Sequence, residues 1–310
     1  MKLDNSDKKS TGFALSLLCL ALLALPGCGA SETGAAYEPT VTMRADALAP
    51  GEATVSDDGG ANTTNGDTPE TQGGTGTLAG QVVFVGQPPQ LPQLVPTKDL
   101  EVCKPYDNER LIVNPQNKGV KNVFIWIERL PKTVAKTPVP EQPALFDQKA
   151  CKFVPHAQLL RAKQIIKVLS DDPIAHNTHT YPGRADVFNS TVQKDREGKT
   201  QFSYNRAEKS PVRIGCDFHG WMEAWQLPLD HSYAALTDAD GRFVLGGTPD
   251  QPDSGLPLPT GKYKLQIWHE AAGSGASNNR FLVKNQSVTI TADKQEVIEI
   301  PYPASRVATN

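Results

Sequence analysis

Short apolar runs separated by turn residues are the feature that most limits what this chain can fold into. Runs such as Gln81–Val85, Val123–Glu128 and Lys262–Trp268 lie close to glycine or proline residues. Lys262–Trp268 alternates apolar and polar residues, which is the two-residue period of a strand with one buried face. A helix would place apolar residues every three or four positions, and this period is largely missing. The pattern therefore predicts an all-β protein.

The length and composition fit two sandwiches. Glycine and proline number 25 each among 310 residues, which indicates many turns, and 38% of the residues are hydrophobic, enough for a sizeable core. At roughly 100–200 residues per domain, the chain holds one large or two small domains with tails. Further runs at 165–169, 212–215, 222–227, 242–245, 288–291 and 296–300 read as strands. We expect a first sandwich over 77–230 and a smaller one over 231–303.

The N-terminal segment predicts export and anchoring. Lys8 and Lys9 precede the apolar run 13–25, which is too short to span a bilayer of about 30 Å and fits a signal peptide over 1–27. The sequence Leu-Pro-Gly before Cys28 resembles the bacterial lipobox. That resemblance implies cleavage before Cys28, a lipid anchor on this cysteine, and a place in the cell envelope at the periplasmic face of the outer membrane. An ordinary signal peptide with a chance cysteine is the alternative.

Residues 28–76 read as a disordered tether, because Tyr37 is their one aromatic residue and such a segment buries too little apolar surface to offset its ordering entropy. The net charge of −3 argues against a nucleic-acid partner. No phosphate-binding glycine loop, Gly-x-Ser-x-Gly or His-Glu-x-x-His motif is present, so we predict that the chain is not an enzyme. Asp171 and Asp172, before Pro173, read as a solvated turn.

The segment from Cys216 to Met222 carries the sharpest chemical signal. It places a thiol (Cys216), an imidazole (His219) and a thioether (Met222) within seven residues. This soft ligand set suits copper, whereas zinc sites seldom use methionine. A mononuclear copper site of two histidines and one cysteine, with a weak axial methionine, needs one more histidine from elsewhere.

The sequence His-Asn-Thr-His at 176–179 can supply that histidine. It follows a predicted strand, so His176 is expected in a loop at one end of the sandwich, where the strand leading to Cys216 could also end. Asn177 could hydrogen-bond across to the other ligand loop and hold the two together. His179 is expected behind the ligands or at the surface, with replacement of His176 as the ligand as the alternative.

Together these segments resemble the cupredoxins, the small blue-copper proteins, of the amicyanin and plastocyanin type. The resemblance implies a Greek-key sandwich, one copper ion held by His176, Cys216, His219 and Met222, single-electron transfer, and a redox protein as partner. It also implies that His219 is the solvent-facing edge, with Phe218 and Trp221 around it. The stretch of 36 residues between His179 and Cys216 and the glycine at position 220 depart from the family pattern.

The resemblance also bears on the remaining cysteines. Cys19 leaves with the signal peptide and Cys28 is lipidated, so with Cys216 on the metal, Cys103 and Cys151 are expected to form a disulfide. Two buried free thiols are the alternative, less expected in an oxidising compartment. Copper storage or delivery, or a non-redox scaffold in the cell envelope, is the alternative to electron transfer.

The C-terminal part resembles a second family. The Thr-Asp-x-x-Gly-x-Phe segment at 237–243 and the Pro-x-Gly-x-Tyr-x-Leu segment at 259–265 are similar to the carboxypeptidase-regulatory-like, transthyretin-type sandwich. An Asp-Gly pair suits a hairpin turn, and glycine before alternating residues suits the start of a strand. The resemblance implies a packing or binding scaffold without chemistry of its own.

Overall fold

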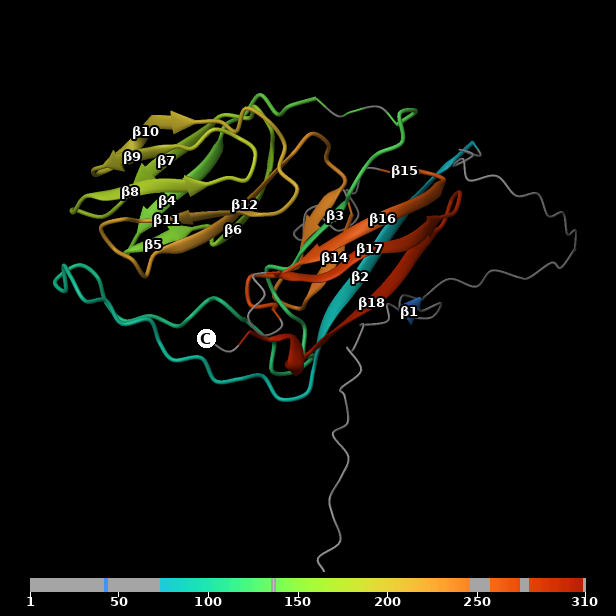
Figure 1. Ribbon diagram of the computed structural model, residues 1–310, viewed down its shortest axis with the longest axis horizontal. Helices are drawn as coiled ribbons and strands as arrows, with labels where there is room; N and C mark the ends of the chain where they lie inside the picture. Colours follow the sequence, from blue (N-terminus) through green and yellow to red (C-terminus); the bar gives the residue numbers. More distant parts are fainter. Residues whose placement is uncertain are drawn as a thin grey trace, which may run out of the picture. The chain divides into compact units, whose positions relative to one another are not determined.

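Strands account for nearly all the regular structure of the protein (Figure 1). The computed structural model describes residues 42–43, 73–134, 136, 138–245, 257–273 and 279–308. Within these ranges the strands lie in four sheets and the single helix is the short 3-10 turn Ala304–Arg306, which confirms the all-β class. The signal peptide, Cys28 and most of the tether lie outside the described residues.

Strands β4 to β12 form the first sandwich. One sheet has the order β10-β7-β4-β5 and the other the order β6-β12-β11-β8-β9. Between them lies a core that includes Phe146, Phe153 and Ile214. The bounds are β4 (Ala144–Lys149), β5 (Lys152–Val154), β6 (Ala157–Arg161), β7 (Ile166–Ser170), β8 (His176–Tyr181), β9 (Asn189–Val192), β10 (Asp195–Phe202), β11 (Val212–Gly215) and β12 (Glu223–Leu229).

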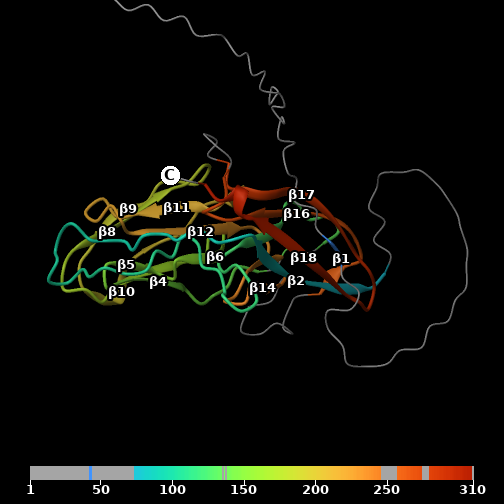
Figure 2. The ribbon, with the colours of Figure 1, turned by 90° about the horizontal axis from the view of Figure 1, so that it is seen from below.

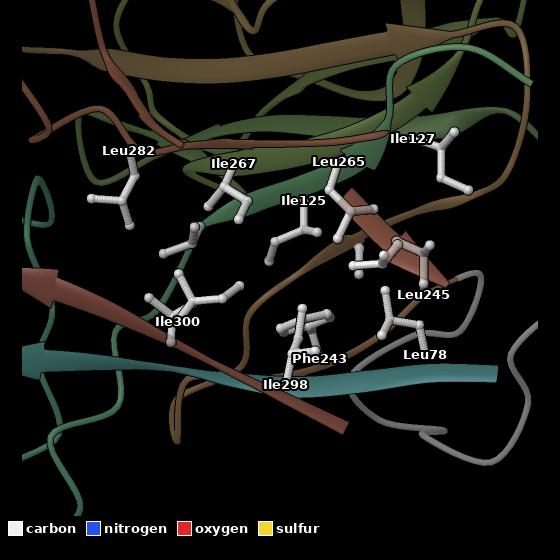
Figure 3. Packing of buried hydrophobic residues seen from close by; sticks show 14 of the residues in the cluster. Leu78, Ile125, Ile127, Phe243, Leu245, Leu265, Ile267, Leu282, Ile298 and Ile300 are labelled. Atoms are coloured by element: carbon white, nitrogen blue, oxygen red, sulfur yellow. The ribbon is translucent and has the colours of Figure 1, made fainter. Parts of the chain in front are cut away.

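The second sandwich joins strands from both ends of the described chain. One sheet has the order β1-β18-β2-β14, with β15 also paired to β2, and the other has the order β13-β3-β16-β17. Figure 3 shows apolar side chains of the two sheets pointing toward one another, with Ile125 and Ile267 on one side and Ile298 and Ile300 on the other. The bounds are β1 (Thr42–Met43), β2 (Thr75–Val85), β3 (Phe124–Ile127), β13 (Ala234–Leu236), β14 (Arg242–Val244), β15 (Leu258–Pro259), β16 (Gly261–Trp268), β17 (Phe281–Ile290) and β18 (Gln295–Pro303).

Two early strands belong to the second sandwich, not to the first as the sequence suggested. β2 pairs in parallel with β18 and antiparallel with β14, while β3 pairs with β13 and β16. Pairing between strands that lie far apart in the chain leaves no local trace in the sequence, because both partners show the same apolar pattern in either sandwich. The predicted tether also departs from full disorder, since β1 pairs with β18 and β2 begins at Thr75.

A long connection, residues 87–122, links β2 to β3 and is called the arm below. Both views in Figures 1 and 2 show it in cyan to green, running beside the strands of the first sandwich. The disulfide between Cys103 on the arm and Cys151 in the β4–β5 turn fixes it there. The predicted disulfide is therefore confirmed, and a segment that starts and ends in the second sandwich contributes to the surroundings of the first.

The two sandwiches also share direct contacts within the compact unit Glu38–Asn310. The Trp225 and Trp268 rings lie 4.8 Å apart between centroids, and the indole of Trp225 donates a 2.9 Å hydrogen bond to Glu270. Leu227 and Phe124 extend this apolar cluster from either side. None of the described helical residues forms a segment with the length and apolar character needed to cross a bilayer.

Candidate metal centre

Two neighbouring strands bring the predicted ligand segments together. β8 and β11 are antiparallel, with Gly215 opposite His179, so the start of β8 and the end of β11 lie at the same end of the sheet. His176 is the first residue of β8, and Cys216 directly follows β11. The expectation of a loop position for His176 is therefore corrected. The stretch between His179 and Cys216 is likewise no plain loop, because it holds strands β9 and β10.

Three potential ligand atoms converge at this end of the sheet. Nδ1 of His176 and Nδ1 of His219 lie 2.9 Å apart, and Sγ of Cys216 lies 3.8 Å from Nδ1 of His219. Each of the three residues offers one ligand atom within 4.8 Å of the others. The side chains of His176 and His219 are 0% exposed and Cys216 is 4% exposed, so the cluster is closed to solvent.

The outer nitrogen of each imidazole faces a carboxylate. Nε2 of His176 lies 2.9 Å from Oδ2 of Asp172, and Nε2 of His219 lies 2.8 Å from Oδ2 of Asp99. An ionised carboxylate only accepts hydrogen bonds, so each Nε2 carries the hydrogen and each Nδ1 presents a lone pair. Carboxylates placed in this way orient metal-binding histidines and raise their basicity.

Two lone pairs 2.9 Å apart repel each other unless a cation lies beside them. A proton is a poor candidate, because burial lowers the pKa of His176 and the adjacent His219 lowers it further, against the opposing effect of the hydrogen bond that His176 donates to Asp172. A metal ion bound by both nitrogens and by the sulfur of Cys216 satisfies the same requirement. The donor set therefore fits a soft or borderline ion such as copper.

Backbone hydrogen bonds hold the thiol and its loop in place. Cys216 is a free, buried cysteine, and its sulfur accepts a 3.4 Å hydrogen bond from the backbone N–H of Asn177. The backbone N–H of Met222 donates to the carbonyl of His219, and that of Cys216 donates to the carbonyl of Met222. Met222 is buried in the same apolar cluster as Cys216. The loop 216–222 is therefore closed on itself around the site.

Asn177 connects the two ligand segments as its sequence position suggested. Its side-chain oxygen accepts a 2.6 Å hydrogen bond from the backbone of Asp217, and its amide nitrogen donates to the Asp217 carboxylate at 2.7 Å. His179 contacts the same carboxylate at 3.1 Å and stacks on Tyr181, outside the three-ligand cluster. Hydrogen bonds from His179, Asn177 and Asn189 lower the pKa of Asp217.

The prediction that His219 faces solvent is wrong. Asp99 of the arm covers its Nε2, and the Trp221 ring lies 5.0 Å from its ring between centroids. Phe218 remains 40% exposed, with Nζ of Lys98 5.8 Å from its ring centroid. No local pattern around His219 indicates this cover, because the arm enters from the other sandwich.

Two functional carboxylates were missed in the sequence. Asp172 is 5% exposed and holds His176, whereas the sequence suggested a solvated turn at this position. Its place four residues before His176 is a signal that could have identified it. Asp99 lies 120 residues before His219, and no local pattern points to it. Cys151 also lies near Asp172 and His176, but its sulfur is bonded to Cys103 and is no free ligand.

Fold and site together define a two-sandwich β-protein with a buried His–Cys–His cluster. No family model matches this chain, and no curated protein matches it. Among solved structures it is similar to a copper-containing nitrite reductase from Thermus scotoductus SA-01, at 11% identity and a TM-score of 0.25 over 32% of this chain. The chain spans 25% of that reductase.

Two smaller copper proteins show a similar likeness. A reduced Cu(I) form of an amicyanin mutant matches at 14% identity and a TM-score of 0.24, over 29% of this chain and 85% of that one. A purple cupredoxin from Nitrosopumilus maritimus matches at 16% identity and a TM-score of 0.23, over 27% of this chain and 98% of that one. At these TM-scores the case for copper rests on the residues of this chain.

Proposed function

We propose that this protein binds one copper ion and transfers single electrons. His176, Cys216 and His219 would hold the ion, with Met222 as a weak fourth ligand. The observation that carries the proposal is the pair of Nδ1 atoms 2.9 Å apart beside a free thiol, with both Nε2 atoms held by carboxylates. Bound copper supplies a one-electron couple between Cu(I) and Cu(II), and this ligand set accepts both states.

The chain's own residues keep the site rigid and dry. β8 and β11 fix His176 and Cys216 through their shared ladder, and Asn177 ties the two ligand segments together. The N–H of Asn177 stabilises negative charge on the sulfur of Cys216. A site held in one geometry in both oxidation states undergoes little rearrangement during electron transfer, which favours a carrier over an enzyme.

A redox protein is the proposed partner, and electrons would pass through the covered side of His219. Trp221 is the aromatic side chain packed against that ring, at a tilt, and the partly exposed Phe218 lies three residues before Trp221. These two side chains offer a short apolar route from the buried imidazole to the surface. An electron-accepting partner would dock on this side of the first sandwich.

Anchoring in the cell envelope completes the proposal. The apolar run 13–25 followed by Cys28 supports export and lipid attachment, and a lipid anchor with more than one acyl chain binds a membrane stably. In a bacterial host, the full chain is expected in the membrane fraction with a lipid mass on Cys28. A Cys28→Ala variant that remains there with its apparent mass unchanged would contradict the anchor.

Copper reconstitution tests the site itself. The purified protein is expected to bind one copper ion and to show an intense thiolate-to-copper absorption band with a matching electron spin resonance signal. Cys216→Ser removes the thiolate and should abolish the band, whereas Asp107→Asn changes an exposed carboxylate away from the ligands and serves as the control. Retention of the band in Cys216→Ser would overturn the proposal.

Copper binding without electron transfer is a second candidate. The observation that favours it is the complete burial of both histidines, which leaves no imidazole edge at the surface. A redox titration separates the two functions. A reversible one-electron couple with copper bound in both states supports the carrier, while loss of the metal in one state supports storage or delivery.

A further inference from the structure

We propose that the Cys103–Cys151 disulfide is a positioning element of the metal site. Its two ends hold Asp99 and Asp172, and these two aspartates hold the two histidine ligands. The inference rests on the proposed function and goes beyond it, because it assigns a role to a cysteine pair that the copper ion does not touch. We call this set of four residues the clamp.

The Cys151 end acts on Asp172 through the turn between β4 and β5. The backbone N–H groups of Ala150 and Cys151 donate to Oδ1 and Oδ2 of Asp172, at 2.7 Å each. The same carboxylate accepts the hydrogen bond from Nε2 of His176 at 2.9 Å. The sulfur of Cys151 also lies within 4.8 Å of the ligating atoms of Asp172 and His176. The turn, the carboxylate and the histidine thus form one connected unit.

The backbone of this turn indicates that its shape is imposed. Ala150 and Cys151 both have positive φ, 52° and 57°, as the two central residues of the hairpin. Such turns favour Asn-Gly or Asp-Gly, because a side chain with Cβ is strained in the left-handed region. Here the carboxylate of Asp172 and the disulfide hold the turn in place, and successive N–H groups of this kind form a concave anion site.

The Cys103 end acts on Asp99 in the arm. The backbone N–H groups of Val102 and Cys103 donate to the carbonyl of Asp99, at 3.0 Å and 2.8 Å. Asp99 also has a positive φ of 52°. This tight turn fixes the distance from the disulfide to the aspartate, whose carboxylate reaches Nε2 of His219 at 2.8 Å. The disulfide is therefore four residues from the group that covers His219.

Two polar links between this part of the arm and the first sandwich are weaker. Lys152 forms a 3.2 Å ion pair with Glu109 in which both side chains are about one-third exposed. The hydroxyl of Tyr106 reaches the carbonyl of Trp221 at a long 3.4 Å. Partly exposed ion pairs and long hydrogen bonds contribute little. A covalent bond at the base of the Asp99 turn is the strongest constraint on the position of Asp99.

Opening the clamp should loosen both imidazoles and uncover the thiol. Cys103→Ser/Cys151→Ser is the direct variant, and the copper-free protein gives the first readout. Modification of Cys216 by an aromatic disulfide reagent, located by peptide mass mapping, is expected to be at least about tenfold faster than in the wild type, because modification requires the buried site to open. This readout needs no metal.

The copper-loaded protein gives the second readout. Loss of groups that orient metal-binding histidines lowers metal affinity by about 10- to 100-fold. We expect this loss, with a shifted thiolate-to-copper band, in the double serine variant and in Asp99→Asn and Asp172→Asn. The two asparagine variants keep the disulfide and the side-chain volume, so they decide the matter if the double variant does not fold. Glu109→Gln removes the Lys152 ion pair and the negative charge beside His156 but leaves the clamp intact, so its copper affinity should match that of the wild type.

The outcomes separate the clamp from the proposed function. Wild-type protein that binds no copper overturns the proposed function, and the Cys216 modification rates then decide the clamp alone. Wild-type protein that binds copper, with unchanged Cys216 rate, affinity and absorption in the double serine variant, overturns the clamp and leaves the copper site standing. Loss of affinity in Glu109→Gln equal to that in Asp99→Asn would also overturn it, because any disturbance of the arm would then have the same effect.

Discussion

Oδ2 of Asp99 lies 2.8 Å from Nε2 of His219, although 120 residues separate them in the chain. Asp99 is on the arm, which leaves and re-enters the second sandwich, whereas His219 is in a loop of the first. The histidine is thereby completely buried. The candidate metal site of one sandwich is therefore completed by a segment of the other, and its geometry depends on both.

Asp99→Ala should destabilise the copper-free protein. The substitution leaves the N–H of His219 buried without an acceptor, which costs about 1–3 kcal/mol. Urea unfolding of the metal-free wild type and variant measures this difference. Asp107→Ala is the matched control, since it removes an arm carboxylate that accepts a hydrogen bond from the exposed side chain of Gln93. Equal stability of the Asp99→Ala variant and the wild type would show that the contact contributes nothing.

The candidate ligands could be identified in the sequence because their signals are local. Cys216, His219 and Met222 lie in one short loop, and His176 precedes an asparagine at the start of a strand. The neighbours that complete the site could not be predicted in the same way. Asp172 looked like part of a polar turn, and Asp99 reaches its histidine only through the folded arm. Whether His219 is buried depends on the tertiary structure. For this reason the sequence wrongly predicted that His219 faces solvent.

The fold shows the same division. Strand periods identified the class and most strands, since a strand with one buried face alternates apolar and polar residues. The pairing of the strands could not be predicted from the sequence, because the partners are far apart in the chain. β2 pairs in parallel with β18, and β3 pairs with β16. The arm between β2 and β3 has little periodicity of its own, and its path is fixed by a disulfide and by side-chain contacts.

Removal of the disulfide should destabilise the protein by about 4 kcal/mol, if its main effect is on the entropy of the unfolded chain. Cys103 and Cys151 are separated by 48 positions, so the bridge closes a long loop. Urea unfolding of Cys103→Ser/Cys151→Ser against the wild type gives the value. A loss below about 1 kcal/mol would contradict the expectation, whatever the effect on copper.

Because of His231, we expect the folded protein to lose stability as the pH falls. Burial lowers its pKa to about 4, with a contribution from the positive charge of Arg161 and against the charge of Asp230. The neutral ring donates to the carbonyl of Ile127 and accepts from the N–H of Tyr233. Its folded pKa is depressed, so the unfolded state binds the proton first as the pH falls.

The sign of the effect follows from this difference. Stability associated with His231 is complete above its ordinary pKa of about 6.5 and is lost as the pH falls toward 4, by up to about 1.4 kcal/mol per pH unit. Unfolding free energies measured from pH 7 to pH 4 should fall more steeply in the wild type than in His231→Gln. Parallel curves for the two proteins would refute the assignment.

For His156 we expect the opposite dependence of stability on pH. Burial alone would lower its pKa, but the hydrogen bond and charge of Glu270, with the charge of Glu109, raise it overall. The stabilisation is therefore fully present below pH 6.5 or so and is lost as the pH rises through the higher folded pKa. His156→Gln should cost most stability near pH 6 and progressively less in alkaline solution. A cost that grows with pH would contradict the ion pair with Glu270.

Gly119, near the end of the arm, lies where the structure leaves no space for a side chain. A Cβ there would lie 1.9 Å from the backbone oxygen of Asp240 and 2.1 Å from its carbonyl carbon. Backbone atoms cannot turn aside as a flexible side chain can, so Gly119→Ala must displace the arm or the β13–β14 turn that holds Asp240. Overpacking of this kind costs about 1–3 kcal/mol or more.

Gly220 provides the matched control, because a Cβ at this position meets no atom within 4 Å. It lies in the ligand loop itself, between His219 and Trp221. Gly220→Ala should therefore unfold at nearly the wild-type urea concentration, while Gly119→Ala unfolds at a clearly lower one. Since the arm also carries Asp99, the Gly119→Ala protein should bind copper more weakly than Gly220→Ala. Equal stability and equal copper affinity of the two variants would show that the arm can shift without cost to the fold or the site.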